Sequence, residues 1–269
     1  MLDLSNITLV SIDSVTDHYS KSNIRLAAIS RIVPKILEEI KFGDVLMINP
    51  FGKNSNLLNL PFEALWDDKN PIKNICWLNN YLVKVLPKLI KTEWYLIIQW
   101  DGFPINFDKW NNKFFEYPFL GGGHSTFNGG FSLRKTETMI EISKVNDIFG
   151  SGAEDGFYSC FLDNEWTLNK TTPFKIKWPE EDIVNEFCFW NTSIQKTSGG
   201  WPSFGWHRYG YLSKINMYQM FDTHRIFSQE DLKKLISYCL YKEIEYPILD
   251  ESPIKLFDIE YNNEFFDNY

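Results

Sequence analysis

The sequence predicts an α/β fold in a single domain, with a βαβ N-terminal half and a mixed α+β C-terminal half. Three observations lead to this prediction: the length, the composition and the order of apolar segments along the chain. A length of 269 residues suits one α/β domain, and 44% hydrophobic with 23% charged residues is the composition of a globular protein. The same composition excludes a disordered chain, a collagen and a small disulfide scaffold.

Strand and helix patterns alternate over the first hundred residues. Short apolar runs predict buried strands, and apolar residues three and four positions apart predict helices. The expected elements are a strand at 7–12, a helix at 26–40, a strand at 45–48, a helix at 75–90 and a strand at 94–98. Pro34 is expected to kink or shorten the first helix. Continuous apolar strands are typical of a parallel sheet that is covered on both faces.

The pattern is less regular after residue 101, where aromatic residues and glycines become frequent. The expected elements there are a helix at 136–148, strands at 174–178 and 186–190, and a helix at 228–240. Residues 250–269 hold six acidic residues and one lysine, a net charge of -5 out of the total of -8. We therefore expect a domain at 1–249 followed by an acidic, aromatic tail at 250–269.

Charge and hydropathy indicate which partners and compartment to expect. A net charge of -8 without a basic stripe argues against a nucleic-acid partner. There is no run of 18 apolar residues and no signal-peptide pattern, so we expect a cytoplasmic protein without a membrane span. The four cysteines are far apart and form no C-x-x-C pair, which favours reduced thiols over disulfides or a zinc site.

Candidate ligand-binding residues follow two of the predicted strands, because ligands bind beyond the carboxyl ends of parallel strands. Asp13 follows the first strand, and Gln99, Trp100 and Asp101 follow the strand at 94–98. Asp101 has two interpretations that the sequence leaves equal: a ligand of a divalent cation or the cap of the next turn.

Three further segments have both a functional and a structural interpretation. Asn128, Gly129 and Gly130 predict a loop that either lets the backbone approach a ligand or is an ordinary turn. The pair Glu154 and Asp155 either complements a helix dipole or supplies a general base. His207, in an aromatic and glycine-containing loop, is either a ligand or a structural histidine.

Sequence motifs of several other enzyme classes are missing. The segment Gly123–Phe127 lacks the closing glycine of a nucleophile elbow, and the chain has neither a Walker A lysine nor an H-E-x-x-H motif. A serine hydrolase, a P-loop enzyme and a zinc protease therefore have little support.

Four segments, in this order, resemble the DUF5672 family of glycosyltransferase-like proteins. The family segments are Q-x-D-G, N-G-G-F-S-L-R, E-D and F-G-[FW]-H, and the matching residues here are Gln99–Gly102, Asn128–Arg134, Glu154–Asp155 and Phe204–His207. The resemblance extends more distantly to GT-A glycosyltransferases. It implies a GT-A-like single domain whose N-terminal half is Rossmann-like.

The resemblance also implies an activity, a substrate class and a cofactor. The activity is transfer of a sugar from a nucleotide-sugar donor, with a UDP-sugar expected, to a hydroxyl acceptor in glycan or polysaccharide biosynthesis. A divalent cation, Mn²⁺ or Mg²⁺, would be held by Asp101 and His207, with Gln99 at the position of the first Asp of a D-x-D metal motif. An uncharged amide is a weaker ligand than a carboxylate, and Gln99 could instead contact the sugar or the ribose.

The remaining roles implied by the resemblance concern the sugar and the base. Asn128, Gly129 and Gly130 correspond to the glycine loop on the acceptor side, and Asp155 corresponds to the general base, with Glu154 beside it. Trp100, Trp201 and Trp206 could supply apolar faces for a sugar. Asp13 is a candidate for nucleotide contact because it follows the first strand.

Two other function classes fit the same residues. One is a non-catalytic module that binds a carbohydrate or a nucleotide sugar. The other is a metal-dependent hydrolase that uses the same acidic residues. Acceptor-dependent product formation separates both from a transferase.

Overall fold

A computed structural model of the chain describes residues 1–12, 29, 32–48, 65–66, 75–100, 102–122, 128–145, 154–163, 172–189 and 203–207. The predicted helix at 228–240, the tail at 250–269, Asp13 and Asp101 lie outside these residues. No helix in the described ranges has both the length and the apolar character needed to cross a membrane.

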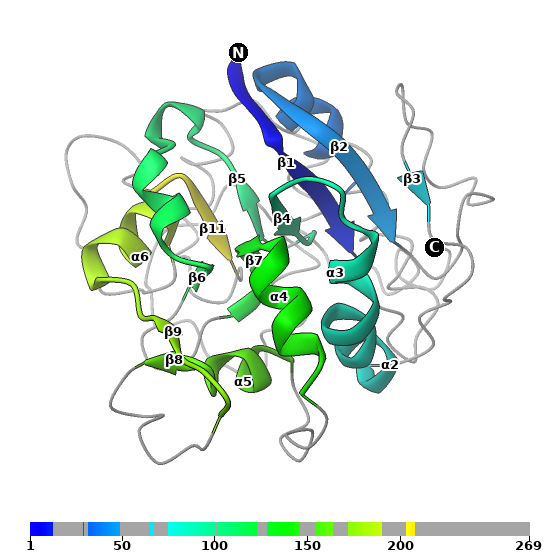
Figure 1. The fold of residues 1–269 in the computed structure, drawn as a ribbon. Coiled ribbons are helices and arrows are strands. Elements are labelled where there is room, and N and C mark those ends of the chain that lie inside the picture. Colours follow the sequence, from blue (N-terminus) through cyan, green and yellow to red (C-terminus); the bar gives the residue numbers. More distant parts are fainter. Residues whose placement is uncertain are drawn as a thin grey trace, which may run out of the picture.

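A six-stranded mixed sheet forms the centre of the fold, as Figure 1 shows. Its strand order is β3-β2-β1-β4-β7-β6. The strands are β1 (Leu2–Ile12), β2 (Ile40–Ile48), β3 (Leu65–Trp66), β4 (Trp94–Ile98), β6 (Phe119–Gly122) and β7 (Asn128–Lys135). The order confirms a mixed α/β fold.

The N-terminal strands are parallel, as the continuous apolar runs predict. β1 pairs in parallel with β2 on one side and β4 on the other, and β2 pairs in parallel with β3. β4 has the predicted bounds and is buried along its whole length. β1 and β2 begin earlier than predicted. The apolar-run pattern does not detect their first halves, because these mix buried with exposed residues and lack the continuous apolar character of the strand ends.

β7 runs against its neighbours. It pairs antiparallel with β4 and with β6. The sequence analysis expected a loop at Asn128–Gly130, whereas these residues are the first three of β7. The side chains of Gln99, His207 and Glu154 occupy the space where a Cβ of these glycines would stand, which explains why this part of the strand carries glycine.

Helices cover the sheet between these strands. Residues 32–39 are helical, with Pro34 inside this stretch, and most of the residues before Pro34 in the predicted helix at 26–40 lie outside the described residues. The helix predicted at 75–90 consists of α2 (Ile75–Asn80), a π-helical turn η2 (Tyr81–Val85) and α3 (Leu86–Leu89). Pro87 has no N–H to donate to a carbonyl of the preceding turn, so the helical hydrogen-bond pattern has to change near it. The π-helical turn η2 lies directly before α3, the helix that contains Pro87. α4 (Thr136–Ser143) is shorter than predicted and packs beside α3, as Figure 1 shows.

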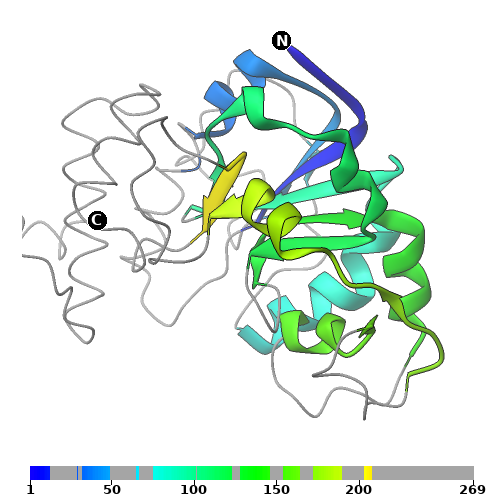
Figure 2. The ribbon, with the colours of Figure 1, turned by 90° about the vertical axis from the view of Figure 1, so that its left-hand side faces the viewer.

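Short elements build a second layer beside β6 and β7. The helical elements are η3 (Phe107–Lys109), η4 (Asn112–Glu116), α5 (Glu154–Ser159) and α6 (Glu181–Phe187). The strands are β5 (Gly102–Pro104), β8 (Leu162–Asp163), β9 (Ile176–Lys177), β10 (Cys188–Phe189) and β11 (Gly205–His207). Figure 2 shows β11 and α6 next to the central sheet.

Two strand predictions in this layer are wrong in extent. The strand at 174–178 is reduced to β9. In the range 186–190, the first two residues belong to the end of α6, the next two form the predicted strand as β10, and residue 190 lies outside the described residues. Glu181 and Asp182 lie in the first turn of α6, where acidic side chains complement the helix dipole. Ile183, Val184 and Phe187 form its buried face, so a helical period was present in this segment.

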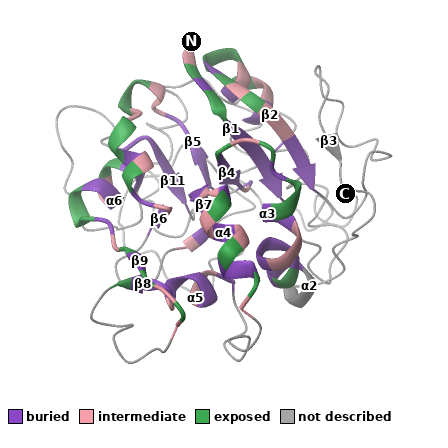
Figure 3. Ribbon diagram, viewed as in Figure 1, coloured by how far each residue is buried: buried purple, intermediate pink, exposed green. Residues whose placement is uncertain are grey.

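An aromatic cluster joins this layer to the central sheet. The Phe131 ring stacks on Phe187 with centroids 4.8 Å apart, and Phe114 contacts Phe187 and Phe204. All four rings are buried, and Figure 3 shows that the buried residues concentrate in the central strands and the helix faces that cover them. The dense aromatic content of the sequence is therefore used in the core in this region.

Candidate functional site

The candidate site lies where β4 ends and β7 begins. Because β7 is antiparallel to β4, with Ile97 opposite Ser132, the first residues of β7 lie at the carboxyl end of β4. Gln99 follows β4 and closes a tight turn with Gly102 through two backbone hydrogen bonds of 2.8 and 3.1 Å. The turn leads into β5, which pairs antiparallel with β11. Three segments that are distant in sequence, namely residues 94–104, the start of β7 and β11, therefore meet at this edge.

Gly130 brings Gln99 and His207 together. A Cβ at Gly130 would stand 2.2 Å from His207 Nε2 and 2.4 Å from Gln99 Oε1, far closer than atoms approach without bonding. His207 lies opposite Gly102 in the β5–β11 pair, and a Cβ at Gly102 would stand 2.3 Å from its Cδ2. The buried imidazole therefore fits only because both neighbours are glycines.

Gly129 faces a second group of polar side chains. A Cβ at this position would stand 1.8 Å from Glu154 Oε1 and 2.7 Å from Arg134 Nη2. The two consecutive glycines therefore separate an imidazole–amide pair from a carboxylate–guanidinium pair. These close approaches explain the missing side chains in the N-G-G segment, whether or not a ligand binds there.

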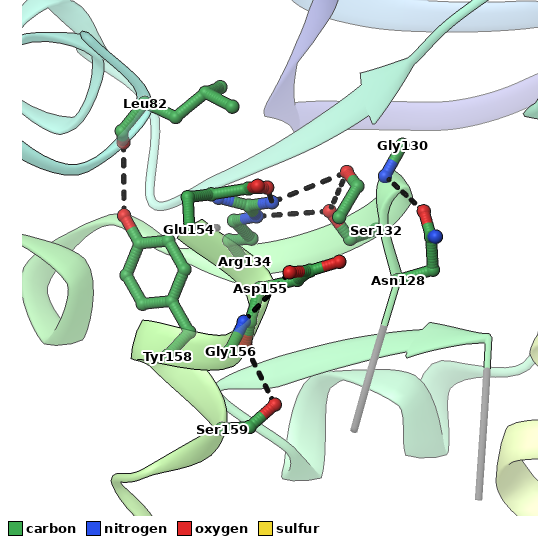
Figure 4. A network of polar contacts seen from close by, with 11 residues as sticks. Leu82, Asn128, Gly130, Ser132, Arg134, Glu154, Asp155, Gly156, Tyr158 and Ser159 are labelled. Atoms are coloured by element: carbon green, nitrogen blue, oxygen red, sulfur yellow. Dashed lines mark hydrogen bonds and ion pairs between the residues drawn. The ribbon is translucent and has the colours of Figure 1, made fainter. Parts of the chain in front are cut away.

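Arg134 and Glu154 form a buried ion pair. Their side chains are 0% and 10% exposed, and Arg134 Nη2 lies 3.0 Å from Glu154 Oε1. The same guanidinium donates from Nη2 to the Gly129 carbonyl at 3.2 Å and from Nε to Ser132 Oγ at 2.9 Å. Ser132 Oγ in turn donates to the Gly129 carbonyl at 2.9 Å. Figure 4 shows this network between β7 and the start of α5.

Aromatic rings surround the guanidinium. It lies over the ring of Tyr158 at 4.8 Å and over that of Phe119 at 5.1 Å. Tyr158 belongs to α5, and its hydroxyl donates to the Leu82 carbonyl at 2.9 Å (Figure 4). A delocalised, weakly hydrated cation suits such an environment better than an ammonium group does.

Burial changes the acid–base properties of this network. Desolvation raises the pKa of Glu154, and the nearby Arg134 opposes the rise. For Arg134, desolvation on its own lowers the pKa, but electrostatic interactions with the ionised forms of Tyr95, Glu154 and Tyr158 produce a net rise. Desolvation also raises the pKa of Tyr95 to about 12. Arg134 therefore stays charged and Tyr95 stays protonated at neutral pH.

Asp155 differs from Glu154 in its surroundings. It is half-buried, and its Oδ1 accepts a hydrogen bond of 2.8 Å from the Gly156 amide. Asn128, also half-buried, accepts one of 2.9 Å at Oδ1 from the Gly130 amide. In Figure 4 the Asp155 carboxylate extends from α5 toward the side of the network where Asn128 and Gly130 lie. Of the two acidic residues, Asp155 is therefore the more accessible.

Two of the three tryptophans predicted to contact a sugar are buried, and the third, Trp201, lies outside the described residues. Trp206 is fully buried, and its ring meets Phe103 edge to face with centroids 5.3 Å apart. Trp100 is also buried. Neither presents an open ring face in this structure, so both act as core residues here.

The described residues do not by themselves make a metal centre. Among them, no three His, Cys, Asp or Glu side chains lie close enough to hold an ion. His207 and Gln99 offer one imidazole nitrogen and one amide oxygen, a weak set for a hard cation. The carboxylate expected beside them, Asp101, lies outside the described residues.

The sequence analysis assigned no role to Arg134 or Ser132. Both are fully buried and lie on the same face of β7, two residues apart. A charged residue at the end of a buried apolar strand requires an opposite charge nearby, and this signal was present in the sequence. What the pattern alone could not indicate was that the partner is Glu154, twenty residues later.

One comparison with known proteins gives a match. Residues 67–207, more than half of the 269 residues, match the DUF5672 family, whose description is "protein of unknown function". The match ends at His207 and includes Gln99, Asn128–Arg134 and the pair Glu154–Asp155. No curated protein matches the chain.

Proposed function

The chain belongs to the DUF5672 family, and from this premise we propose that it is a glycosyltransferase that moves a sugar from a nucleotide-sugar donor to a hydroxyl acceptor. The observation that carries the proposal is the convergence at Gly129 and Gly130. Gln99 and His207 lie on one side of these glycines, and Glu154, followed directly by Asp155, lies on the other. The more distant resemblance to GT-A glycosyltransferases noted under Sequence analysis implies a role for the same residues.

The transfer requires one bond to form and one to break. The acceptor oxygen bonds to the anomeric carbon of the sugar, and the bond from that carbon to the diphosphate oxygen breaks. The electron pair leaves with the nucleoside diphosphate, and the proton of the acceptor hydroxyl passes to the Asp155 carboxylate. Asn128, beside the glycines, has an amide group that suits a sugar hydroxyl.

The architecture supports this proposal in two ways. Ligands of parallel α/β sheets bind beyond the carboxyl ends of the strands, and Gln99 follows β4 at that edge. The reversed strand β7 brings the glycine segment to the same edge. A parallel sheet followed by a reversed strand is also compatible with the GT-A-like fold that the resemblance implies.

A divalent cation remains part of the proposal, with Asp101 and His207 as its ligands. Mn²⁺ or Mg²⁺ bound there would neutralise negative charge on the departing diphosphate. His207 is held next to Gln99 and Gly130, and Asp101, the second expected ligand, lies outside the described residues.

A second candidate function follows from the amide at position 99. An uncharged Gln99 beside His207 favours a module that binds a nucleotide sugar without transferring it, because the metal affinity of such a pair is low. This candidate predicts donor binding by calorimetry with no release of nucleoside diphosphate.

A donor panel tests the proposal. The full chain is incubated with nucleoside diphosphate sugars, with and without Mn²⁺ and with a mixture of glycan acceptors, and nucleoside diphosphate and glycosylated product are quantified. A transferase forms both in equal amounts, and the rate depends on acceptor. Free sugar released at an acceptor-independent rate identifies a hydrolase instead, and binding without turnover identifies the non-catalytic module.

A further inference from the structure

The ion pair of Arg134 and Glu154 joins two elements that the proposed transferase needs at a fixed separation. Arg134 lies near the end of β7, but its side chain reaches back to the Gly129 carbonyl near the start of the strand. The same Nη2 atom donates to Glu154, the first residue of α5. A single guanidinium therefore connects the beginning of β7 to the beginning of α5.

The geometry of this connection is rigid. The planar guanidinium has three fixed contacts, to Ser132, Gly129 and Glu154, and is packed between the rings of Phe119 and Tyr158. A planar fork with several fixed partners has little freedom to rotate, in contrast to the flexible ammonium of a lysine.

The candidate chemical groups are direct neighbours of the two connected residues. Asn128 precedes Gly129, and Asp155 follows Glu154. Both neighbours are half-buried, whereas Arg134 and Glu154 are buried. Any shift between β7 and α5 would therefore change the distance between the Asp155 carboxylate and the Asn128–Gly130 segment.

We propose that Arg134 and Glu154 are positioning residues that hold Asp155 at a fixed place opposite the Asn128–Gly130 segment. The inference rests on the proposed function, because it assigns the pair to the same site. In this scheme neither residue touches the substrate, and Glu154 is not a second catalytic acid.

Arg134→Lys is the main test, because it keeps the positive charge but removes the planar fork. Leu133→Ala is the matched control, since Leu133 is the adjacent buried residue on β7 and its side chain points to the opposite face. Both variants lower stability, but only the first alters the connection to α5. Glu154→Asp is the second variant, because it shortens the carboxylate side chain by one methylene and keeps the charge.

Two readouts separate a positioning role from a purely structural one. The first is the steady-state rate per folded molecule. Arg134→Lys is expected to lower kcat by about 10- to 100-fold, because a displacement of reacting groups near 1 Å reduces reaction rates by this order. The KM for the donor is expected to change by less than about twofold, because neither residue of the pair contacts the donor. The second is amide hydrogen exchange at Gly130 and Gly156, whose N–H groups donate to Asn128 and Asp155. Both amides are expected to exchange faster in Arg134→Lys than in Leu133→Ala.

The outcomes distinguish this inference from the proposed function. Equal kcat per folded molecule and equal exchange in Arg134→Lys and Leu133→Ala would overturn the positioning role even if the wild type is a transferase. If the wild type transfers no sugar from any donor, the proposed function fails, while faster exchange at Gly130 and Gly156 in Arg134→Lys would still support the connection between β7 and α5.

Discussion

Arg134→Met tests whether the buried ion pair is as important to the fold as its geometry suggests. The substitution removes the cation and leaves the Glu154 carboxyl buried without an opposite charge. Both side chains are almost fully enclosed, at 0% and 10% exposed, so solvent screening is weak. Removing one partner of such a pair costs roughly 3–5 kcal/mol of unfolding free energy. For a domain of this size the loss lowers the melting temperature by on the order of 10 °C.

Lys144→Met is the matched control. Lys144 pairs with Glu141 on the surface, where the two side chains are 62% and 51% exposed. The same change of a cation to methionine there should cost only about 0–1 kcal/mol. Urea denaturation of the three proteins at pH 7 measures the difference.

The cost of Arg134→Met should also depend on pH. Burial already raises the pKa of Glu154 in the folded protein, and the loss of Arg134 removes the group that opposes this rise. A carboxyl whose pKa is higher in the folded than in the unfolded protein stabilises the fold at pH values below its unfolded pKa of about 4.5. This contribution to the free energy of unfolding is lost as pH rises through the folded pKa. The penalty should therefore shrink as pH falls from 7 toward 5. A penalty similar to that of Lys144→Met, or one independent of pH, would refute this reasoning.

Three further predictions concern single buried positions. Gly130→Ala introduces a Cβ within 2.4 Å of two neighbouring polar atoms, and a loss of about 1–3 kcal/mol in urea denaturation is expected; an unchanged midpoint would show that the neighbours move aside freely. Burial raises the pKa of Tyr95 to about 12, so this residue alone should lower the unfolding free energy above pH 10 by up to about 1.4 kcal/mol per pH unit. Tyr95→Phe should weaken this pH dependence. Burial raises the pKa of the Cys188 thiol, so peptide mapping after alkylation at pH 8 should find it labelled more slowly than the half-buried Cys160, and equal rates would contradict its burial.

Much of the central sheet could be predicted from the sequence, because its strands are short apolar runs with a strong local signal. β4 has the predicted bounds, and the parallel arrangement of β2, β1 and β4 follows from strands that are buried on both faces. The start of β7 could not be predicted in the same way. Its two glycines indicate a turn locally, whereas in the structure they lie in a strand where His207, Gln99 and Glu154 fill the space that larger side chains would need.

The candidate site was predictable as a set of segments but not as a set of roles. The sequence order of Gln99, Asn128–Gly130, Glu154–Asp155 and His207 indicated one site, and the structure brings the glycines together with Gln99, Glu154 and His207. Apart from the family resemblance, the sequence did not distinguish Glu154 from Asp155, and only the structure shows that Glu154 is the one buried against Arg134. Nor could the sequence show that Trp206 packs against Phe103, because a buried and an exposed tryptophan leave the same local pattern.

The most direct test of the central claim is the transfer rate of Asp155→Asn with the donor that the wild type uses. Asp163→Asn, at an exposed position in β8, is the matched control. Loss of a general base predicts a fall in kcat of about 10²- to 10⁴-fold for Asp155→Asn with little change in melting temperature, and a wild-type rate for Asp163→Asn. A full transfer rate in Asp155→Asn would contradict the assignment of this carboxylate as the base.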